Sequence, residues 1–360
     1  MAGSSEIKAA PERQTELDIV KFIAILPMPI AHCLAESGYD STHGVWYFLN
    51  VMLGATVFMV CMGYGFAFSR RTSKEYLIRR GIKTLLMGYA LNIVRCLMPV
   101  ILSLVLQDDT YLAEDLGGFA DGDILQFAGL AMIVTGFLQD TGNPPLYAVI
   151  IGVVLSVAHT FIPTLTFSDT LPAALCGLFV YSENSLVSMD FPFFAWYIFV
   201  AAGYLLGSKL KKAENLTSFY LKAGIPCAVL ALGYWIFSCI QGSGPMNPDI
   251  EGLSMMNFQD ALASVGWIIC YIGLTRFLTR LIPQKIQAFA VRASSAVNEI
   301  YIAHWIILFW VVLPVFRLLE TLPSMPLAAG CGLLVLALSV FAGLFYCRLK
   351  AKRAAKRVGG

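Results

Sequence analysis

Apolar runs of about 17 to 25 residues recur along the whole chain and constrain its fold more than any other feature of the sequence. Each run is long enough to cross the hydrocarbon core of a bilayer as an α-helix, whose backbone hydrogen bonds are all made internally. Hydropathy places such helices at 17–35, 45–69, 80–106, 123–139, 145–162, 191–208, 223–241, 258–275, 295–316 and 326–346. The sequence therefore predicts an all-α fold, a polytopic membrane helical bundle of about ten transmembrane helices.

The composition agrees with a membrane protein and excludes several other classes. The chain is 58% hydrophobic and 13% charged, whereas about a quarter of the residues in a typical soluble domain are charged. The net charge of +2 gives no basis for binding nucleic acid. The nine cysteines lack the spacing of a metal or disulfide framework. We therefore expect no bound metal and no nucleic-acid partner.

The basic residues determine the expected orientation, because Lys and Arg accumulate on the cytoplasmic side of membrane proteins. With ten helices and a cytoplasmic N-terminus, all but Arg95 and Arg317 of the 25 Lys and Arg residues fall on that side. Counting the short apolar segment 171–182 as an eleventh crossing would move the basic loop 209–222 outside, so we expect this segment to be re-entrant or interfacial. Both termini are then cytoplasmic, in a plasma or inner membrane. The chain divides into a cytoplasmic segment (1–16), one transmembrane domain (17–347) and a basic cytoplasmic tail (348–360).

Two histidines at the outer half of the first helical hairpin are candidate bases. Ionisable side chains at membrane depth are unfavourable, so each one is a candidate functional residue. His32 lies late in the first helix, after Pro27 and Pro29, which should kink the helix and widen the space around it. His43 lies in the following loop. A base at either position would meet an acceptor that arrives from outside.

Arg95 and His304 are the other candidates inside predicted helices. Arg95 lies roughly 15 Å into the membrane at 1.5 Å per residue, and a functional role competes with a buried pair to a carboxylate or with snorkelling. Asn92, one turn earlier, and Gln126 are polar neighbours that can share a cavity with Arg95. For His304, which follows Tyr301 by one turn, a functional role and a hydrogen-bonded bridge between helices are equally supported.

A basic run at the cytoplasmic rim of the third predicted helix has two interpretations. It includes Arg79, Arg80 and Lys83, and positive-inside anchoring accounts for it on charge alone. The run also faces the compartment that contains coenzyme A, whose phosphates would attract these side chains.

Six motifs follow one another along the chain. They are LDIVK (17–21) followed by ten residues and then His32, VFMVCMGYGFAFSRR (57–71), LIRRGIKTLLMGY (77–89), GDILQFAGL (122–130), FPFFAWYIFVAAGYLLG (191–207) and AVNEIYIAHW (296–305). Taken together they resemble integral-membrane acyltransferases of the acyltransferase-3 family and of the related heparan-α-glucosaminide N-acetyltransferase-like family. Lys21 stands where the acyltransferase-3 pattern has an arginine.

The resemblance implies transfer of an acyl group, acetyl foremost, from cytosolic acyl-CoA to a hydroxyl or amine at or across the membrane, without a metal. Acyltransferase-3 proteins carry the base at the position of His32. Heparan-type proteins carry a histidine eleven residues later, which matches His43, and this sequence has both. On this interpretation the donor binds to Arg79, Arg80, Lys83, Arg95 and Gln126, with support from Asp18, Lys21, Asn92, Tyr301 and His304.

The sequence leaves the acceptor open among a glycan, a lipid-linked sugar and a small molecule, and it also leaves open a homodimer. A transporter or flippase of an acylated or glycan intermediate is the main alternative, because ten helices with charges at mid-membrane also suit transport. The lack of a convincing internal repeat weighs against it. A sensory membrane domain that has lost its chemistry is a third alternative.

Overall fold

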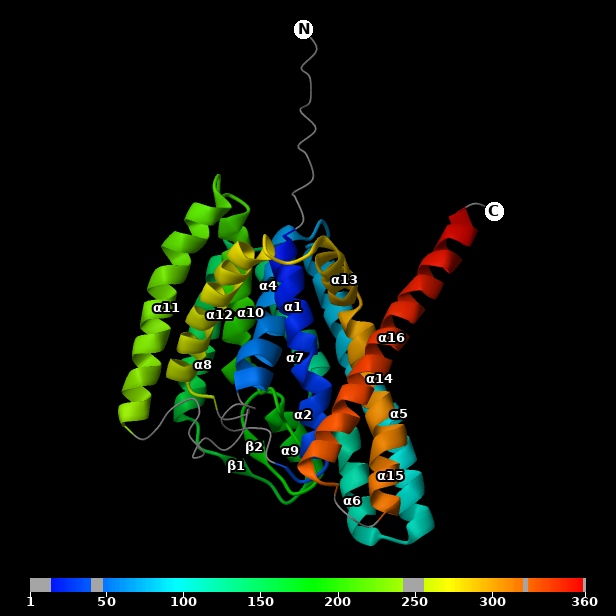
Figure 1. Ribbon diagram of the computed structural model, residues 1–360. Coiled ribbons are helices and arrows are strands. Elements are labelled where there is room, and N and C mark those ends of the chain that lie inside the picture. The colour runs from blue at the N-terminus through cyan, green and yellow to red at the C-terminus, as the bar shows by residue number, and fades with distance from the viewer. Residues whose placement is uncertain (1–13, 40–47, 242–255, 320–322, 359–360) are drawn as a thin grey trace.

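The computed structural model describes residues 14–39, 48–241, 256–319 and 323–358, and it confirms the predicted helical membrane bundle (Figure 1). Within these residues nine helical segments are long and apolar enough to cross a membrane: Thr15–Ala35, Val51–Phe68, Lys74–Leu106, Pro144–Phe161, Phe193–Leu210, Leu216–Ile240, Phe258–Thr279, Val297–Leu318 and Met325–Lys356. The segment Ile124–Leu138 is a shorter apolar helix of 15 residues. These ten segments match the ten predicted helices in order.

The elements run along the chain in one sequence, in which helices predominate. They are α1 (Thr15–Ile25), α2 (Pro27–Ala35), η1 (Phe48–Ala55), α4 (Thr56–Phe68), α5 (Lys74–Leu106), α6 (Asp109–Gly117), η2 (Gly118–Ala120), α7 (Ile124–Leu138), α8 (Pro144–Phe161), β1 (Leu165–Thr166), α9 (Thr170–Gly177), β2 (Ser182–Glu183), α10 (Phe193–Leu210), α11 (Leu216–Ile240), α12 (Phe258–Thr279), α13 (Gln284–Ser295), α14 (Val297–Ile307), η4 (Leu308–Val312), α15 (Leu313–Leu318) and α16 (Met325–Val358). The two short strands pair in parallel.

The first predicted helix is interrupted where its prolines predicted a kink. Helix α1 ends at Ile25 and α2 begins at Pro27. Pro27 and Pro29 have no backbone N–H, so the carbonyl groups of Ile23 and Ile25 lose their usual partners four residues ahead. The N–H of Leu26 instead donates to the Ile23 carbonyl at 3.1 Å. This break lies one to two turns before His32 and sets the direction in which α2 carries it.

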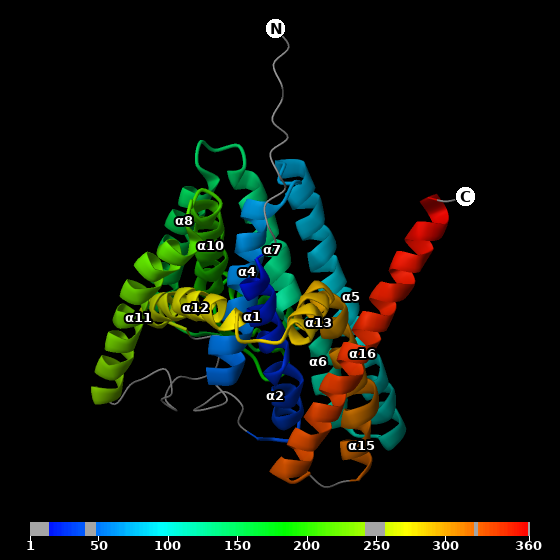
Figure 2. The same cartoon turned by 45° about the horizontal axis from the view of Figure 1, so that its top comes forward.

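Close helix crossings hold the bundle together where small residues face each other. A Cβ at Gly63 in α4 would come within 1.9 Å of the Val200 carbonyl oxygen, and a Cβ at Gly203 in α10 would come equally close to the Val60 carbonyl oxygen. Glycines at both positions therefore allow the two backbones to touch, as is common between membrane helices. On the other side of the bundle α5 packs on α7, and α16 packs on both α2 and α14 (Figure 2). That packing brings α2, α5, α7 and α14 together.

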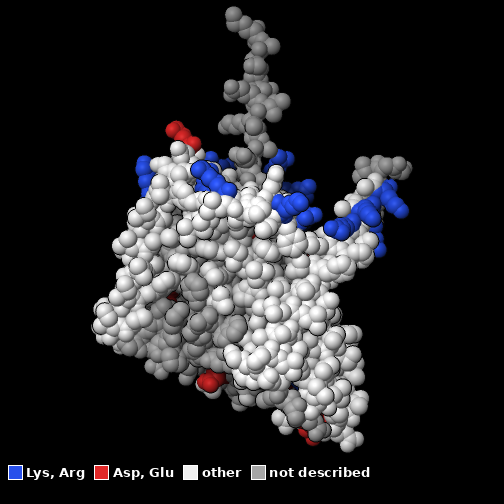
Figure 3. All heavy atoms as spheres, in the orientation of Figure 1, with Lys and Arg blue, Asp and Glu red and all other residues white. Residues whose placement is uncertain are grey.

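The two ends of the bundle differ in charge and in structure. Most Lys and Arg side chains visible in Figure 3 lie at the end where α1 begins and α16 finishes, here called the basic end. The strands, α6 and α9 lie at the opposite end (Figure 1). Helix α9 has 8 residues, about 12 Å at 1.5 Å per residue. The segment 171–182 is therefore too short to cross, as predicted.

Candidate active site

His32 lies in a cluster of aromatic rings between α2 and α14. Its imidazole is 4.3 Å from the indole of Trp305 and 5.4 Å from the ring of His304, measured between centroids. The two histidine rings are stacked, with an interplanar angle of 21°. His304 is completely buried, whereas His32 is partly exposed. Of the two, His32 is the more exposed residue.

Arg95 forms the next layer of the cluster, directly against Trp305. Its guanidinium carbon is 4.5 Å from the centroid of Trp305 and 5.3 Å from that of Phe309. Phe309 belongs to η4, a π-helical segment that widens the helix after α14, and such segments are frequent at functional sites. Arg95 Nη2 pairs with Asp121 Oδ2 at 2.8 Å. The side chain is 5% exposed, so this ion pair is buried on the arginine side.

One donor of Arg95 is left over. Its Nε–H is buried and has no hydrogen-bond partner among the residues that the structure describes. Buried donors without partners are rare in folded proteins and are expected where a ligand or water supplies the acceptor. Because Trp305 contacts both His32 and Arg95, this donor belongs to the same cluster as His32.

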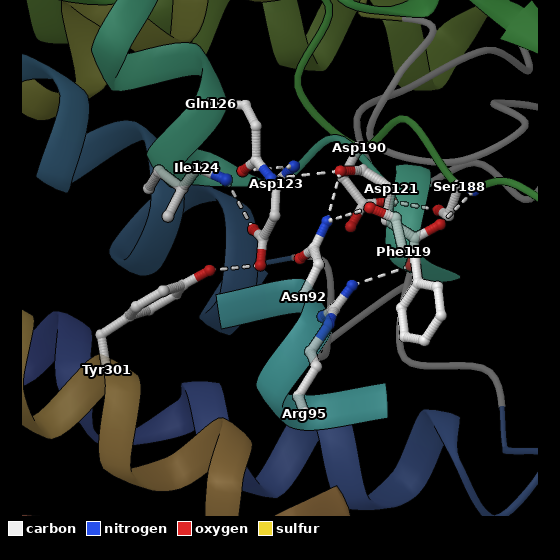
Figure 4. A network of polar contacts seen from close by, with 10 residues as sticks. All are labelled: Asn92, Arg95, Phe119, Asp121, Asp123, Ile124, Gln126, Ser188, Asp190 and Tyr301. Atoms are coloured by element: carbon white, nitrogen blue, oxygen red, sulfur yellow. Dashed lines mark hydrogen bonds and ion pairs between the residues drawn. The ribbon is translucent and has the colours of Figure 1, made fainter. Parts of the chain in front are cut away.

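The loop that carries Asp121 is fixed by side chains from α5 and α7 (Figure 4). Asn92 Nδ2 donates to the Asp121 carbonyl at 2.8 Å, and Gln126 Nε2 donates to the same oxygen at 3.1 Å. The backbone N–H of Ser188 donates to Asp121 Oδ1 at 2.9 Å. The carboxylate therefore has one oxygen on Arg95 and the other on the loop before α10, which leaves it little freedom.

Asp123 connects this loop to α14. As the N-cap of α7 it accepts the backbone N–H of Ile124 at 2.6 Å, and Gln126 completes a capping box. The hydroxyl of Tyr301 donates to the second carboxylate oxygen (Figure 4). Tyr301 also lies edge-on to His304, with ring centroids 5.2 Å apart. The network thus runs from the α7 N-terminus through Tyr301 to the two stacked histidines.

Burial raises the pKa of two carboxyl groups in the loops beside this network, Asp121 and Asp190. Loss of hydration raises the pKa of Asp121 to about 7, an effect larger than the opposing one of Arg95. Loss of hydration also raises the pKa of Asp190 to about 6, and the nearby Asp123 acts in the same direction. Ser188 Oγ donates to Asp190 Oδ1 at 2.8 Å. Both carboxyl groups therefore gain and lose protons close to neutral pH.

The structure brings together His32, Asn92, Arg95, Gln126, Tyr301 and His304 of the predicted site residues. Arg95 pairs with a buried carboxylate, Asp121, which is one of the alternatives predicted for it. The pair also belongs to the histidine cluster, because Arg95 packs on Trp305 and Trp305 contacts His32. His43 lies outside the described residues.

The remaining predicted residues lie far from His32. Arg79, Arg80 and Lys83 are exposed near the start of α5, and Lys83 is about 18 Å from Arg95 along the helix at 1.5 Å per residue. Lys21 and Asp18 form a pair at 3.6 Å on α1, before the proline break, and Ser294 Oγ donates to Asp18 Oδ1 at 2.7 Å. They can support the basic end of the bundle but do not contact the His32 cluster.

Sequence reasoning missed Asp121, Asp123, Asp190 and Trp305 as site residues. Asp121 directly precedes the motif GDILQFAGL (122–130), Asp123 is its second residue, and Trp305 is the last residue of AVNEIYIAHW. A buried arginine requires a carboxylate partner, which was the signal for these residues. Several acidic residues on the predicted outer loops could have supplied it, so the sequence did not identify which one.

Helices of this length around a buried histidine, arginine and carboxylate define a multi-pass membrane protein with a polar site inside the bundle. A family model described as an acyltransferase domain matches residues 14–345. The chain therefore belongs to the acyltransferase-3 family of membrane acyltransferases. No curated protein shows a significant match to the chain. The resemblance to the heparan-α-glucosaminide N-acetyltransferase-like family stays a prediction.

Proposed function

We propose that this protein transfers an acyl group, acetyl foremost, from acyl-CoA to a hydroxyl or amine acceptor, with His32 as the general base. The observation that carries the proposal is the position of His32, a partly exposed residue whose imidazole lies beside the Trp305–Arg95 layer. Family membership supports acyl transfer in general. The donor, the acyl group and the base are our assignments.

In the proposed reaction His32 accepts the proton of the acceptor hydroxyl while its oxygen attacks the thioester carbonyl carbon. The resulting tetrahedral oxyanion collapses, the carbon–sulfur bond breaks, and the thiolate takes up the proton from the imidazolium. An ester and free coenzyme A are formed, and His32 returns to its neutral state. General base catalysis of this kind contributes about 10²- to 10⁴-fold to the rate.

Arg95 is the group best suited to stabilise the oxyanion. Its Nη2 is occupied by Asp121, whereas its Nε–H is buried and unpartnered among the described residues. A fixed cationic donor in a site of low dielectric constant stabilises developing negative charge without reorganising at the moment of reaction. Asp121 and Trp305 hold the guanidinium in place.

The donor would enter from the basic end, which we assign to the cytosol because basic residues are retained there. Arg79, Arg80 and Lys83 are exposed on α5 and can contact the nucleotide phosphates. The same helix carries Arg95 deeper in the bundle. A donor lying along α5 would therefore place its charged group at the rim and its thioester toward His32.

The test measures acyl-CoA hydrolysis and transfer by the full-length protein in detergent. His32→Ala should lose at least about 100-fold in turnover, with thermal stability close to that of the unmodified protein. His159→Ala is the matched control, because His159 is a buried histidine on α8. His43→Ala is tested separately. Full activity of His32→Ala would overturn the assignment of the base.

A further inference from the structure

Helix α16 is longer than a membrane is thick. It has 34 residues, about 51 Å at 1.5 Å per residue, whereas the hydrocarbon core of a bilayer is about 30 Å thick. Its apolar part ends near Tyr346, and the remaining residues to Val358 include six Lys and Arg and no acidic residue. Figures 1 and 2 show this part of α16 leaning away from the bundle at the basic end. The helix therefore leaves the hydrocarbon among the lipid headgroups, with its cations beside them.

One face of α16 packs on the bundle. A Cβ at Gly343 would come within 2.6 Å of Ile300 Cγ1, and Ser339, one turn earlier, is completely buried. Lys350, two turns after Gly343, continues this face, and its ammonium lies 4.0 Å from a carboxylate oxygen of Glu299 on α14. The bundle therefore occupies this side of the helix as far as Lys350.

The opposite face of α16 carries exposed apolar side chains. They are Leu334, Leu338, Phe341 and Phe345, spaced three or four residues apart, so that they lie one above another along the helix. Phe341 is 70% exposed and Phe345 is 50% exposed, and their rings stack with centroids 6.1 Å apart. In a membrane-spanning helix, apolar side chains that face away from the bundle contact the acyl chains of lipids.

This row continues as cations where the helix leaves the hydrocarbon. Arg348, Lys352 and Lys356 follow Phe345 at spacings of three, four and four residues, and all three are exposed (Figure 3). At 3.6 residues per turn the four apolar and three basic positions share a sector of about 80° on the helix surface. Arg348 is about 5 Å beyond Phe345 along the axis, and the long side chains of the two lysines can reach back toward the headgroups. We call these seven residues the α16 stripe.

An occupant of the whole α16 stripe must carry hydrocarbon next to negative charge. A soluble anion would match the three cations but not the four apolar side chains. A second copy of this chain would bring another row of cations against the first, and like charges oppose association. A phospholipid with a net negative headgroup matches both parts, because its acyl chain lies along the apolar side chains and its phosphate meets the cations.

We propose that the α16 stripe binds anionic phospholipid in the leaflet at the basic end, and that the bound headgroups hold the last two turns of the helix on the membrane surface. Residues 351–356 are all exposed, and a short helical end without packing is unstable by itself in water. Lipid phosphates supply the contacts that stabilise it. The inference is independent of acyl transfer, because it uses none of the residues assigned to that reaction.

The first test measures lipid selectivity. The full-length protein in detergent is titrated with phosphatidylglycerol or phosphatidylcholine of identical acyl chains, and native mass spectrometry gives the affinity of the first bound lipid. Each cation near an anionic headgroup contributes about 1 kcal/mol, or about fivefold. The triple variant Arg348→Gln, Lys352→Gln, Lys356→Gln should therefore bind phosphatidylglycerol roughly 100-fold more weakly, with phosphatidylcholine unchanged. Unchanged binding of phosphatidylglycerol would overturn the inference.

A matched variant controls for net charge. Lys212→Gln, Lys222→Gln, Lys285→Gln removes three exposed cations from the loop after α10, from α11 and from α13. It should bind phosphatidylglycerol as the unmodified protein does, and an equal loss in both triple variants would show general attraction without a site. Coenzyme A is then added as a soluble phosphate. It should leave the bound phosphatidylglycerol in place, and displacement of the lipid would assign the three cations to a nucleotide instead.

The second test measures order at the end of α16. Hydrogen exchange of the amides of 351–356 should be slower in nanodiscs that contain phosphatidylglycerol than in nanodiscs of phosphatidylcholine alone, and high salt should remove the difference. The triple variant of the α16 stripe should show no difference between the two lipids. Equal exchange in the unmodified protein would refute the ordering of the helix end. His32→Ala should behave as the unmodified protein in both tests, so this result and that of the acyltransferase assay are separable.

Discussion

The indole of Trp305 packs on the imidazole of His32, with ring centroids 4.3 Å apart. The same indole carries the guanidinium of Arg95 at 4.5 Å. One side chain on α14 therefore sets the positions of the proposed base on α2 and of the proposed oxyanion donor on α5. Since misplacing reacting groups by about 1 Å can reduce a rate 10²-fold, Trp305 should act as a positioning residue.

Trp305→Phe and Trp305→Ala separate packing from chemistry. Phenylalanine keeps a ring against His32 and Arg95, so we expect less than about a tenfold loss of turnover. Alanine leaves a cavity and should lose roughly 100-fold in turnover and about 3–5 kcal/mol in stability. Turnover, KM for acetyl-CoA and the melting temperature are measured for both. Equal turnover of the two variants would show that the ring does not position the site.

The Arg95–Asp121 pair can be tested by a double-mutant cycle. Arg95→Met alone leaves a desolvated carboxylate and should destabilise the protein by about 3–5 kcal/mol. Asp121→Asn added to Arg95→Met should recover a large part of that stability, because no buried charge is left unpaired. Turnover should stay at least about 100-fold down in the double variant, since the oxyanion donor is absent. Recovery of turnover together with stability would make Arg95 purely structural.

Tyr301→Phe tests the link between α14 and the α7 N-terminus. The variant removes the donor to Asp123, which should reduce stability by about 1–3 kcal/mol because a buried acceptor loses its partner. Tyr220→Phe is the matched control: that hydroxyl is also buried but has no hydrogen-bond partner in the described residues. Removing the Tyr220 hydroxyl should leave the stability of the protein nearly unchanged. Melting temperatures of the two variants decide, and equal losses would contradict the role of the hydrogen bond.

The helices, the proline break and the polar positions inside the helices could be predicted because hydropathy and proline chemistry are local properties of the sequence. Arg95, Asn92 and Gln126 were predicted neighbours, and the structure joins all three to Asp121. The pairing of α2 with α14 and α16 is different. That pairing depends on which faces of the helices meet in the fold, which hydropathy does not specify. The contact between Trp305 and His32 could therefore not be predicted from the sequence. The acidic cavity between the segment 181–190 and the loop that carries Asp121 was also missed, since it forms from loops separated by about seventy residues.

The grouping of Lys21 with the base has a related explanation. The spacing between Lys21 and His32 is a property of the sequence motif, and a motif does not specify distance in space. The break at Leu26 and the length of the helices place Lys21 toward the basic end, where it pairs with Asp18 at 3.6 Å. Two residues of one motif can therefore lie toward opposite ends of the same membrane-spanning segment.

The raised pKa values of Asp121 and Asp190 predict how stability depends on pH. Both groups ionise near 3.8 when unfolded and near 7 and 6, respectively, when folded. Between these values the folded state binds protons that the unfolded state has released, so the free energy of unfolding falls as pH rises and levels off above about pH 7. Asp190→Asn should flatten the decline between about pH 4 and 6, whereas Asp169→Asn should not. Thermal unfolding from pH 4 to 8 measures this, and a rise in stability over that window would contradict it.

The basic rim of α5 should bind the donor without taking part in the chemistry. Arg79→Ala and Arg80→Ala each remove an exposed cation, so the KM for acetyl-CoA should rise by about 2- to 5-fold per residue, with turnover unchanged, because an exposed charge contributes about 0.2–1 kcal/mol. Thermal stabilisation by coenzyme A should fall in parallel, since stabilisation follows affinity. Lys285→Ala, an exposed cation on α13 at the same end, is the control for general attraction. If it weakens binding as much as Arg79→Ala, the basic end attracts the donor by its general charge, and the α5 rim is not a specific phosphate site.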